Sequence, residues 1–534
     1  MPIPLAQRTK LGVTGRRIAD ASVGLLTVLF ALACAAFVRQ DGLGTFADDS
    51  VSYLVMAQVF SPWHAASPPV AEAFRLEAFH PPLFPAVLAL ANVAHDIAGA
   101  HVFIALLMAA CLPLGYLLAT RWLAGRGAAA LAAASVAALP VLWIQARGIL
   151  SEPLFCALLL GCLVVMERDA GTRANRMLLA LLLAALALTR TAGVVMALAY
   201  AGWAAFQPAA GMRQRAGKVL PGLVAVAAYA AWVVLRPAEV LDMNAQLAAE
   251  RFRAILAAEE PVRAVLAGVA RQAQAMGEAW AGALLLFWVE GQPARPVLAG
   301  AVAALGIAGL VMRLMARKPD AWMLVAYLGL YLLWPFYDQM TRFLFPVLPL
   351  VLLYAFVAVQ RLIRRPILGP AALALATLSL AAPGLAFIHQ RARTEAAQAR
   401  IVDWYRVPDL ASARARSQVH LELEGDMKAI RRLVGPEARV MWVAPAYIAL
   451  LAQRHAVPAA DWRDGPEALL KSIETHRPHY VFLSEYHPRD TIRDEAWRVG
   501  LAAMSGRGTV VHARHGPEGR LSAVLVRLMA ESAP

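Results

Sequence analysis

The sequence contains few charged residues and few cysteines for its length. Charged side chains make up 16% of its 534 residues, whereas soluble domains have about 25%. Every cysteine lies inside an apolar run and the hydrophilic segments have none, which argues against disulfide bonds and thiolate metal sites. An ordinary soluble domain and a disulfide-stabilised secreted domain are therefore both disfavoured. The cysteines are Cys34, Cys111, Cys156 and Cys162.

What the sequence has in excess is apolar residues. They make up 60% of the chain, with a mean hydropathy of +0.57, against about 45–50% in soluble domains. Many apolar runs are long enough to approach or cross the bilayer core, and together they predict about eleven membrane-spanning helices. The clearest runs are 18–38, 102–120, 297–315, 322–336, 343–359 and 367–388, and weaker ones are 128–144, 153–166, 177–188, 193–206 and 219–235.

The basic residues follow the predicted membrane topology. Lysine and arginine number 50 against 36 acids, a net charge of +14, and they cluster at alternate connections between the apolar runs. Short basic loops stay in the cytoplasm, so we expect a multi-pass protein of a bacterial inner membrane with its N-terminus inside and its C-terminus outside. Scattered clusters of this kind do not form the basic stripe of a nucleic-acid-binding surface. The clusters lie at 8–17, 121–126, 168–176, 213–218, 313–318 and 361–365.

The chain divides into a membrane part and a tail. We expect residues 1–388 to form the membrane domain, with outer-face loops at about 39–101 and 236–296. An apolar stretch in the first loop, ending near Asp96, breaks the alternation of basic loops and predicts a half-inserted helix. Residues 389–534 are more charged, and strand-length runs at 440–444, 480–485, 509–513 and 522–527 predict a small outer-face α/β domain.

Two adjacent acids, Asp48 and Asp49, follow the first predicted span. Asp49, Tyr53 and Ala57 are spaced four apart, so on a helix they share one face. Acids at the end of a span are often simply solvated, and spacing alone favours that interpretation. A catalytic role is the alternative.

Four further residues interrupt or border apolar runs. His80 precedes two prolines, which can merely rigidify a loop, and Glu152 follows Ser151 where a helix cap is expected. Arg190 would cost about 2.5–3.5 kcal/mol at mid-membrane, so we expect two short helices that turn there. Arg342 borders the tenth predicted span, where it either snorkels towards headgroups or binds a lipid phosphate.

The order of these motifs resembles the GT-C superfamily of integral-membrane glycosyltransferases. The likeness is to the branch of protein O-mannosyltransferases and lipid A aminoarabinose transferases, which is glycosyltransferase family 39-like, and it covers roughly residues 18–388. It implies a polytopic α-helical membrane protein with a C-terminal soluble domain. The matching pieces are Asp49-Ser50-Val51-Ser52-Tyr53, His80-Pro81-Pro82-Leu83-Phe84-Pro85, Ser151-Glu152-Pro153-Leu154-Phe155, Leu188-Thr189-Arg190 and Arg342-Phe343-Leu344-Phe345-Pro346.

The resemblance implies an activity and assigns roles to residues. It makes Asp49 the catalytic carboxylate, with Asp48 as the neighbouring candidate, and implies a polyprenyl-phosphate-linked sugar donor with inversion at C1. The acceptor is a lipid, a glycan or a protein. Ser50 and His80 stand where the family often has glutamate and lysine, which leaves the donor sugar open.

The same resemblance implies a set of donor-binding residues. Arg342 is the expected partner of the donor phosphate, with His80 or Arg190 beside it, and Tyr53 and Glu152 complete the expected set. Asp48, Asp49 and His80 could ligate a divalent metal, but the resemblance implies no metal or other cofactor.

Two other functions fit the same hydropathy. A transporter or flippase of lipid-linked glycans predicts ionisable residues deep within the spans, whereas the charged residues here fall almost wholly at span ends. A non-catalytic membrane scaffold that displays the tail predicts that Asp49→Asn leaves glycan transfer unchanged.

Overall fold

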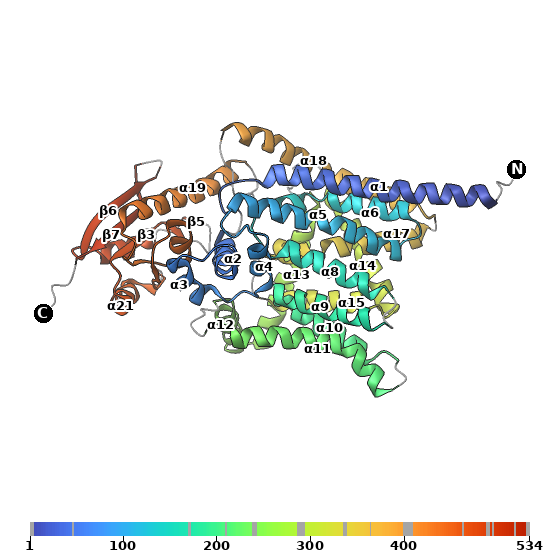
Figure 1. Cartoon of the computed structure of the whole chain (residues 1–534), viewed down its shortest axis with the longest axis horizontal. Helices are drawn as coiled ribbons and strands as arrows, with labels where there is room; N and C mark the ends of the chain where they lie inside the picture. Colours follow the sequence, from blue (N-terminus) through green and yellow to red (C-terminus); the bar gives the residue numbers. More distant parts are fainter. Residues whose placement is uncertain are drawn as a thin grey trace.

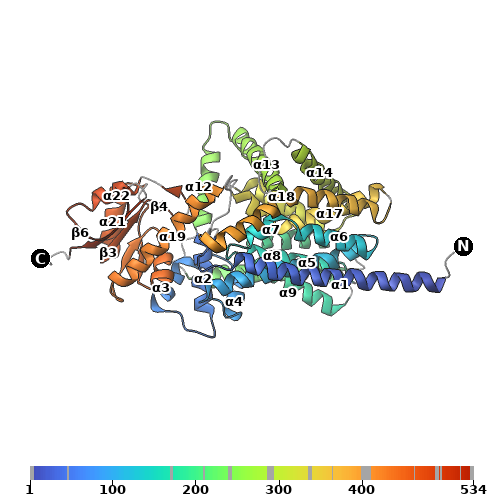
Figure 2. The same ribbon diagram turned by 90° about the horizontal axis from the view of Figure 1, so that it is seen from above.

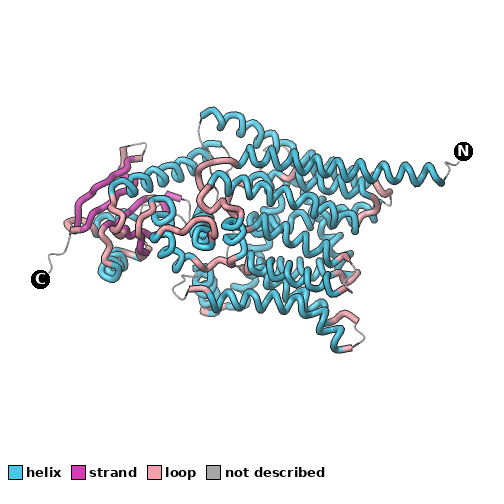
Figure 3. Tube along the Cα trace, in the orientation of Figure 1, coloured by secondary structure: helices cyan, strands magenta, loops and turns pink. Residues whose placement is uncertain are grey.

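The computed structural model describes residues 5–44, 47–168, 172–208, 211–237, 243–285, 294–334, 339–363, 365–398, 410–461, 464–487, 492–493, 496–516 and 519–529. A long helical bundle carries a smaller α/β domain at one end, which we call the domain end (Figures 1 and 2). Among the residues that the structure describes, strands are confined to that domain (Figure 3). The fold is the predicted one, a polytopic α-helical membrane protein with a C-terminal α/β domain.

Helices coincide with all the predicted apolar runs. Six described helical segments are long and apolar enough to cross a membrane, and four further apolar helices are shorter. The bundle helices are α1 (Leu5–Val38), α5 (Ile97–Trp122), α6 (Arg126–Ala137), α7 (Pro140–Gln145), α8 (Glu152–Met166), α9 (Arg173–Thr189), α10 (Ala192–Ala205), α11 (Met212–Leu235), α14 (Ala294–Met315), α15 (Pro319–Leu333), α16 (Met340–Leu344), η2 (Phe345–Val347), α17 (Leu348–Ile363) and α18 (Leu368–Gln398).

The turn expected at Arg190 is present. Helix α9 ends at Thr189, Arg190 adopts extended backbone as its C-cap, and α10 begins at Ala192. The second helix folds back closely, since a Cβ on Gly193 would lie 2.4 Å from the carbonyl oxygen of Leu186. Both helices then pack against α11. The arginine thus lies at a helix end, where its charge avoids the middle of a span.

The first loop folds into three short helices at the domain end, α2 (Ala47–Phe60), α3 (Pro68–Glu77) and α4 (Leu83–Leu90). At eight residues, α4 is about 12 Å long, too short to cross a bilayer core of about 30 Å. Just before α2, Gly44 forms a bridge with Gly148 at a φ of +75°. A Cβ on Gly44 would lie 2.0 Å from the carbonyl oxygen of Arg147, so this approach requires glycine.

The second predicted loop contains helices that the apolar pattern did not indicate, α12 (Met243–Leu256) and α13 (Pro261–Leu285). The last turns of α13 are buried at Ala283, Leu284 and Leu285, and the helix packs against α15 and α16. The apolar stretch 284–289, beside Trp280, predicts a segment that lies in the membrane interface, and its part from residue 286 onward lies outside the described residues. Much of this loop is therefore part of the bundle wall.

The C-terminal domain is built on a five-stranded sheet of order β2-β1-β3-β7-β6. Strands β1–β3 and β1–β2 pair in parallel, and β7 pairs antiparallel with β3 and β6. All four predicted strands are present, as β1, β3, β6 and β7. The elements are α19 (Leu410–Leu433), β1 (Val440–Trp442), α20 (Pro445–Tyr447), η3 (Ile448–Ala452), β2 (Ala456–Pro458), α21 (Pro466–His476), β3 (Tyr480–Ser484), β4 (Tyr486–His487), β5 (Ile492–Arg493), α22 (Trp497–Ala503), β6 (Gly508–His515) and β7 (Leu521–Leu528).

The domain packs directly on the first loop. Helix α20 and the π-helical turn η3 contact both α2 and α3, and His455 Nδ1 lies 2.7 Å from Glu72 Oε2 of α3. The helix that carries Asp49 therefore lies between the bundle and the C-terminal domain (Figure 1).

Candidate active site

Five of the residues singled out in the sequence meet at the domain end of the bundle. Asp49 comes from the first turn of α2, His80 from the connection between α3 and α4, and Glu152 from the first turn of α8. Arg190 comes from the turn between α9 and α10, and Arg342 from α16. Five separate segments thus supply one cluster of charged and polar side chains.

Arg342 is the centre of the cluster. Its guanidinium contacts both Asp49 and Glu152, through Nη2 and Nε respectively, and its side chain is only 6% exposed. The hydroxyl of Tyr327 donates a hydrogen bond of 2.5 Å to the carbonyl oxygen of Phe343, the next residue along α16. Packing of α13 on α16 adds a second support. The backbone that carries the Arg342 side chain is therefore held in place by two separate contacts.

Glu152 joins the two arginines. Its Oε1 atom lies 2.6 Å from Arg190 Nη1 and also accepts from Arg342. The Glu152 side chain is fully buried, and its Oε2 atom has no hydrogen-bond partner among the described residues. A carboxylate in the first turn of a helix also interacts favourably with the helix dipole. Glu152 thus positions both guanidinium groups, which a donor-binding role did not by itself predict.

The sequence analysis treated Ser151 only as a helix cap, and the structure gives it more contacts. Its hydroxyl accepts from Arg190 Nη1 at 3.1 Å and lies 2.9 Å from the Tyr53 hydroxyl. No side-chain capping bond is present at this helix start. Ser151 therefore connects α2 to the arginine cluster, a role that the Ser-Glu-Pro sequence could not distinguish from a cap.

His80 is held in an aromatic setting. Its ring centroid lies 4.4 Å from that of Tyr53 and 4.1 Å from that of Phe79, and Nε2 is 3.8 Å from Asp49 Oδ1. Burial lowers the pKa of His80 to about 4, even though the charge of Asp49 acts in the opposite direction. Near neutral pH the ring is uncharged, so His80 brings a hydrogen-bonding group to the site and no positive charge.

Asp49 is the accessible member of the cluster. Its side chain is 23% exposed, whereas that of Glu152 is fully buried. Burial raises the pKa of Asp49, but the positive charge of Arg342 outweighs it and holds the pKa below its usual value. The carboxylate is therefore ionised at neutral pH and able to accept a proton.

Asp48 lies on a different side of α2. It lies in the first turn of the helix with Asp49, and together with burial and Tyr486 its charge raises the pKa of Tyr447 in the C-terminal domain. Asp49, on the neighbouring position, is the acid whose carboxylate contacts the guanidinium of Arg342. Among the described residues, no three side chains of His, Cys, Asp or Glu are arranged to share a metal ion.

Aromatic residues that the sequence analysis missed line the cluster on the bundle side. Tyr327 and Tyr331 lie four apart on α15 with ring centroids 4.9 Å apart, and Tyr331 stacks on Phe343 at 4.8 Å. Their spacing on one helix face was the available signal, but it resembles that of any buried aromatic pair.

The arrangement of helices defines the class of fold, which is the one seen in solved structures of membrane-bound transferases. No protein-family description matches the sequence. No curated protein matches it either.

Among solved structures, the chain is similar to ArnT from Cupriavidus metallidurans. For ArnT in the apo state the TM-score is 0.54 at 14% identity, covering 97% of this chain and 99% of that one. For ArnT bound to undecaprenyl phosphate it is 0.53 at 13% identity, covering 96% and 98%. The oligosaccharyltransferase of Archaeoglobus fulgidus gives 0.47 at 12% identity, covering 96% and 74%.

Proposed function

We propose that this protein is an integral-membrane glycosyltransferase that moves a sugar from a polyprenyl-phosphate donor to a lipid, glycan or protein acceptor. The observation that carries the proposal is the contact between Asp49, partly exposed, and the buried guanidinium of Arg342. One is a base and the other a phosphate-binding group, and they lie side by side at the end of a bundle long enough to cross a membrane. The structure of ArnT with undecaprenyl phosphate is consistent with a donor of this class.

The reaction requires three groups at one place. The bond from C1 of the sugar to the phosphate oxygen breaks, and its electron pair leaves with the polyprenyl phosphate. The acceptor hydroxyl forms the new bond to C1 while its proton passes to the Asp49 carboxylate. Attack on the face opposite to the leaving group inverts C1. Arg342 and Arg190 stabilise the charge that develops on the phosphate, since fixed donors need no rearrangement as the charge grows.

Because Asp49 is paired with Arg342, binding of the donor should also change the pKa of Asp49. Without donor, the two arginines are balanced by Asp49 and Glu152. A donor phosphate that binds Arg342 competes with Asp49 for the same N–H groups. Asp49 then loses part of its stabilisation, its pKa rises, and it becomes a stronger base for the acceptor hydroxyl.

The proposed sidedness follows from the chain's basic loops. These loops are cytoplasmic by the positive-inside rule, which puts the domain end at the outer face of a bacterial inner membrane. Nucleotide sugars are made in the cytoplasm, so a transfer at that face needs a donor already carried across the membrane on a lipid. The aromatic and arginine residues of the cluster suit the phosphate of such a donor at headgroup level.

A genetic experiment tests the activity. Glycolipids and glycans from a deletion strain are compared by mass spectrometry with those from strains restored by the wild-type chain, Asp49→Asn or Asp48→Asn. We expect one glycan modification to be absent from the deletion and Asp49→Asn strains and present in the other two. Full restoration by Asp49→Asn at matched protein levels contradicts the proposal.

A further inference from the structure

A pocket lies on the far side of α2 from the arginine cluster. It has a volume of about 470 Å³ and is lined from α2 by Leu54 and Gln58 and from the C-terminal domain by Arg431 and Gln453. Gln58 is nine residues beyond Asp49, which on an α-helix places it about 180° around the axis. None of the proposed donor-site residues lines this pocket, so the two sites are separate although both use α2.

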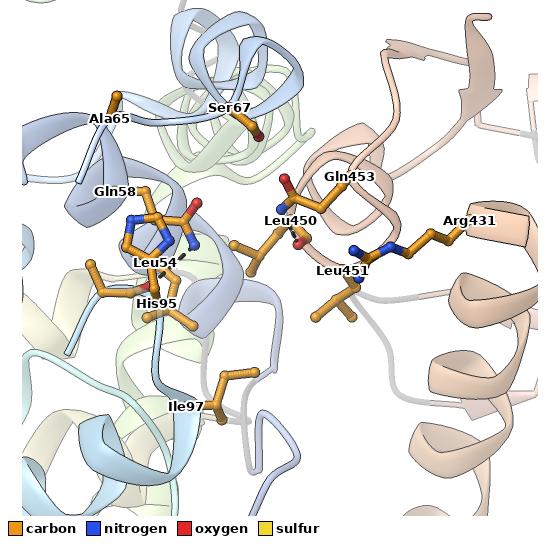
Figure 4. Close-up of a pocket in the computed structure, with 11 residues that line it drawn as sticks. Leu54, Gln58, Ala65, Ser67, His95, Ile97, Arg431, Leu450, Leu451 and Gln453 are labelled. Atoms are coloured by element: carbon orange, nitrogen blue, oxygen red, sulfur yellow. Dashed lines mark hydrogen bonds between the residues drawn. The ribbon is translucent and has the colours of Figure 1, made fainter. Parts of the chain in front are cut away.

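The polar groups of this pocket are cationic or neutral. Arg431 of α19 extends its guanidinium towards the cavity (Figure 4), and no ion pair is found for it among the described residues. The Ser67 hydroxyl points into the same space, and its oxygen is buried without a hydrogen-bond partner in the described part of the chain. The amide groups of Gln58 and Gln453 each donate one hydrogen to a backbone carbonyl, of Ala94 and Leu450, and have a second hydrogen that can bind a ligand. His95 is a further neutral polar group, and no acid is among the described lining residues. A site of this chemistry favours an anion.

The remaining walls are apolar. Leu54, Leu450, Leu451 and Ile97 face the cavity, so a free, fully hydrated anion would leave much of the pocket surface unused. An anionic group attached to an apolar body satisfies both kinds of wall. This combination indicates an amphiphile as the ligand.

The position of the pocket relative to the membrane indicates that this amphiphile is a membrane lipid. Ile97 is the first residue of α5, one of the helices long and apolar enough to cross a membrane. Trp63, in the segment that contributes Ala65 and Ser67 to the pocket, is 57% exposed, and its indole donates to the carbonyl oxygen of Leu90 at 3.3 Å. Trp63 lies in the connection between α2 and α3, and tryptophan is enriched at membrane–water interfaces. The pocket is therefore at the level of lipid headgroups.

We infer that this pocket binds the anionic headgroup of a membrane lipid, with Arg431 as the partner of its phosphate. The lipid would contact α2 and α19 at once and so join the helix that carries Asp49 to the C-terminal domain. The binding is independent of the donor and of glycosyl transfer, because it uses the opposite face of α2.

Native mass spectrometry of the full-length protein tests the inference. The purified chain is titrated with phosphatidylglycerol, with zwitterionic phosphatidylcholine and with inorganic phosphate. We expect a tight phosphatidylglycerol adduct that the other two do not form. Arg431→Gln should weaken it about tenfold, the loss expected for a hydrogen bond to a charged group. Arg432→Gln, the neighbouring exposed arginine on α19 that does not line the pocket, is the control and should bind as the wild type does.

A second variant guards against a folding defect in Arg431→Gln. Ala65 is exposed at the rim, so Ala65→Trp fills the cavity without disturbing a buried contact, and the adduct should disappear. Unchanged phosphatidylglycerol binding in Ala65→Trp overturns the inference. So does equal weakening by Arg431→Gln and Arg432→Gln, or binding of inorganic phosphate without binding of the lipid.

Discussion

Two buried ion clusters lie at opposite ends of the bundle, and they differ in how completely their groups are paired. At the end away from the C-terminal domain, Arg313 donates to both oxygens of Asp320 at 2.6 Å and to Glu167 at 2.7 Å. The Tyr354 hydroxyl donates to Asp320 at 2.7 Å, and the Trp122 indole donates to Glu167 at 2.7 Å. None of these side chains has a buried polar atom without a partner in the described chain.

The cluster at the domain end is incomplete by the same measure. Glu152 Oε2 and His80 Nε2 are buried without a hydrogen-bond partner among the described residues, and Asp49 is partly open to solvent. A buried group without a partner costs stability, so its persistence beside an accessible carboxylate indicates a place for a ligand. The saturated cluster instead fastens α5, α8, α14, α15 and α17 together.

The largest effect should come from removing the proposed base. Asp49→Asn keeps the side-chain shape but cannot accept the acceptor proton, so we expect transfer to fall about 10²–10⁴-fold. The measurement is sugar transfer by purified protein from a polyprenyl-phosphate donor. Asp48→Asn is the matched control and should retain most activity. Equal losses in the two variants would mean that the contact with Arg342 does not distinguish the two acids.

A substitution in the fully paired cluster around Arg313 should lower the stability of the protein and leave the rate of catalysis unchanged. Asp320→Asn leaves Arg313 with Glu167 as its only remaining acidic partner in this cluster, which for a buried pair costs about 3–5 kcal/mol. We expect a lower thermal unfolding midpoint with an unchanged kcat in the folded fraction. Glu260→Gln breaks an exposed pair with Arg263 and should leave the midpoint nearly unchanged. A selective loss of kcat in Asp320→Asn would assign this cluster a part in the reaction.

Arg342 links the geometry of the site to its pH dependence. Asp49 must be ionised to act, so kcat/KM should be constant above its pKa and fall as the pH drops through it. Arg342 holds that pKa low, hence Arg342→Gln should move the acid limb to higher pH and reduce transfer about 10²–10³-fold. Arg342→Lys keeps the charge and should leave the limb nearer to that of the wild type. An acid limb at the same pH in Arg342→Gln would show that another group titrates.

Local physics made much of the fold predictable from the sequence. Apolar runs marked the bundle helices, the cost of a buried charge predicted the turn at Arg190, and strand-length runs marked four of the five strands in the sheet. Strand β2 has only three residues, too few to show a pattern. Helix α13 was missed because charged residues such as Arg271 and Glu278 break up its apolar run in the sequence. It is held in place by packing against α7, α14, α15, α16 and α18.

The sequence allowed us to predict which residues form the site, but not which of them contact one another. Asp49, Glu152 and Arg342 were candidates because each interrupts or borders an apolar run, and the family likeness ranked them. Spacing within one helix carries no information about which distant segment lies opposite, so the bridge by Glu152 could not be foreseen. The same limit hid Ser151, whose hydroxyl meets Tyr53 and Arg190 only after three segments have packed together.

The smallest effect should come from Ser151, and it sharpens the comparison of the two clusters. Ser151→Ala removes one acceptor from Arg190 and one partner from Tyr53, with an expected two- to tenfold loss of kcat/KM, roughly the worth of one or two hydrogen bonds. Glu152 still binds Arg190, so the positive charge stays in the site while the orientation of the guanidinium becomes less restricted. The loss should therefore fall on KM for the donor more than on kcat. Ser151→Thr restores the hydroxyl and should recover most activity. A variant that unfolds more readily but keeps its kinetic constants would make Ser151 a packing residue, and the domain-end cluster would then resemble the saturated one more than we propose.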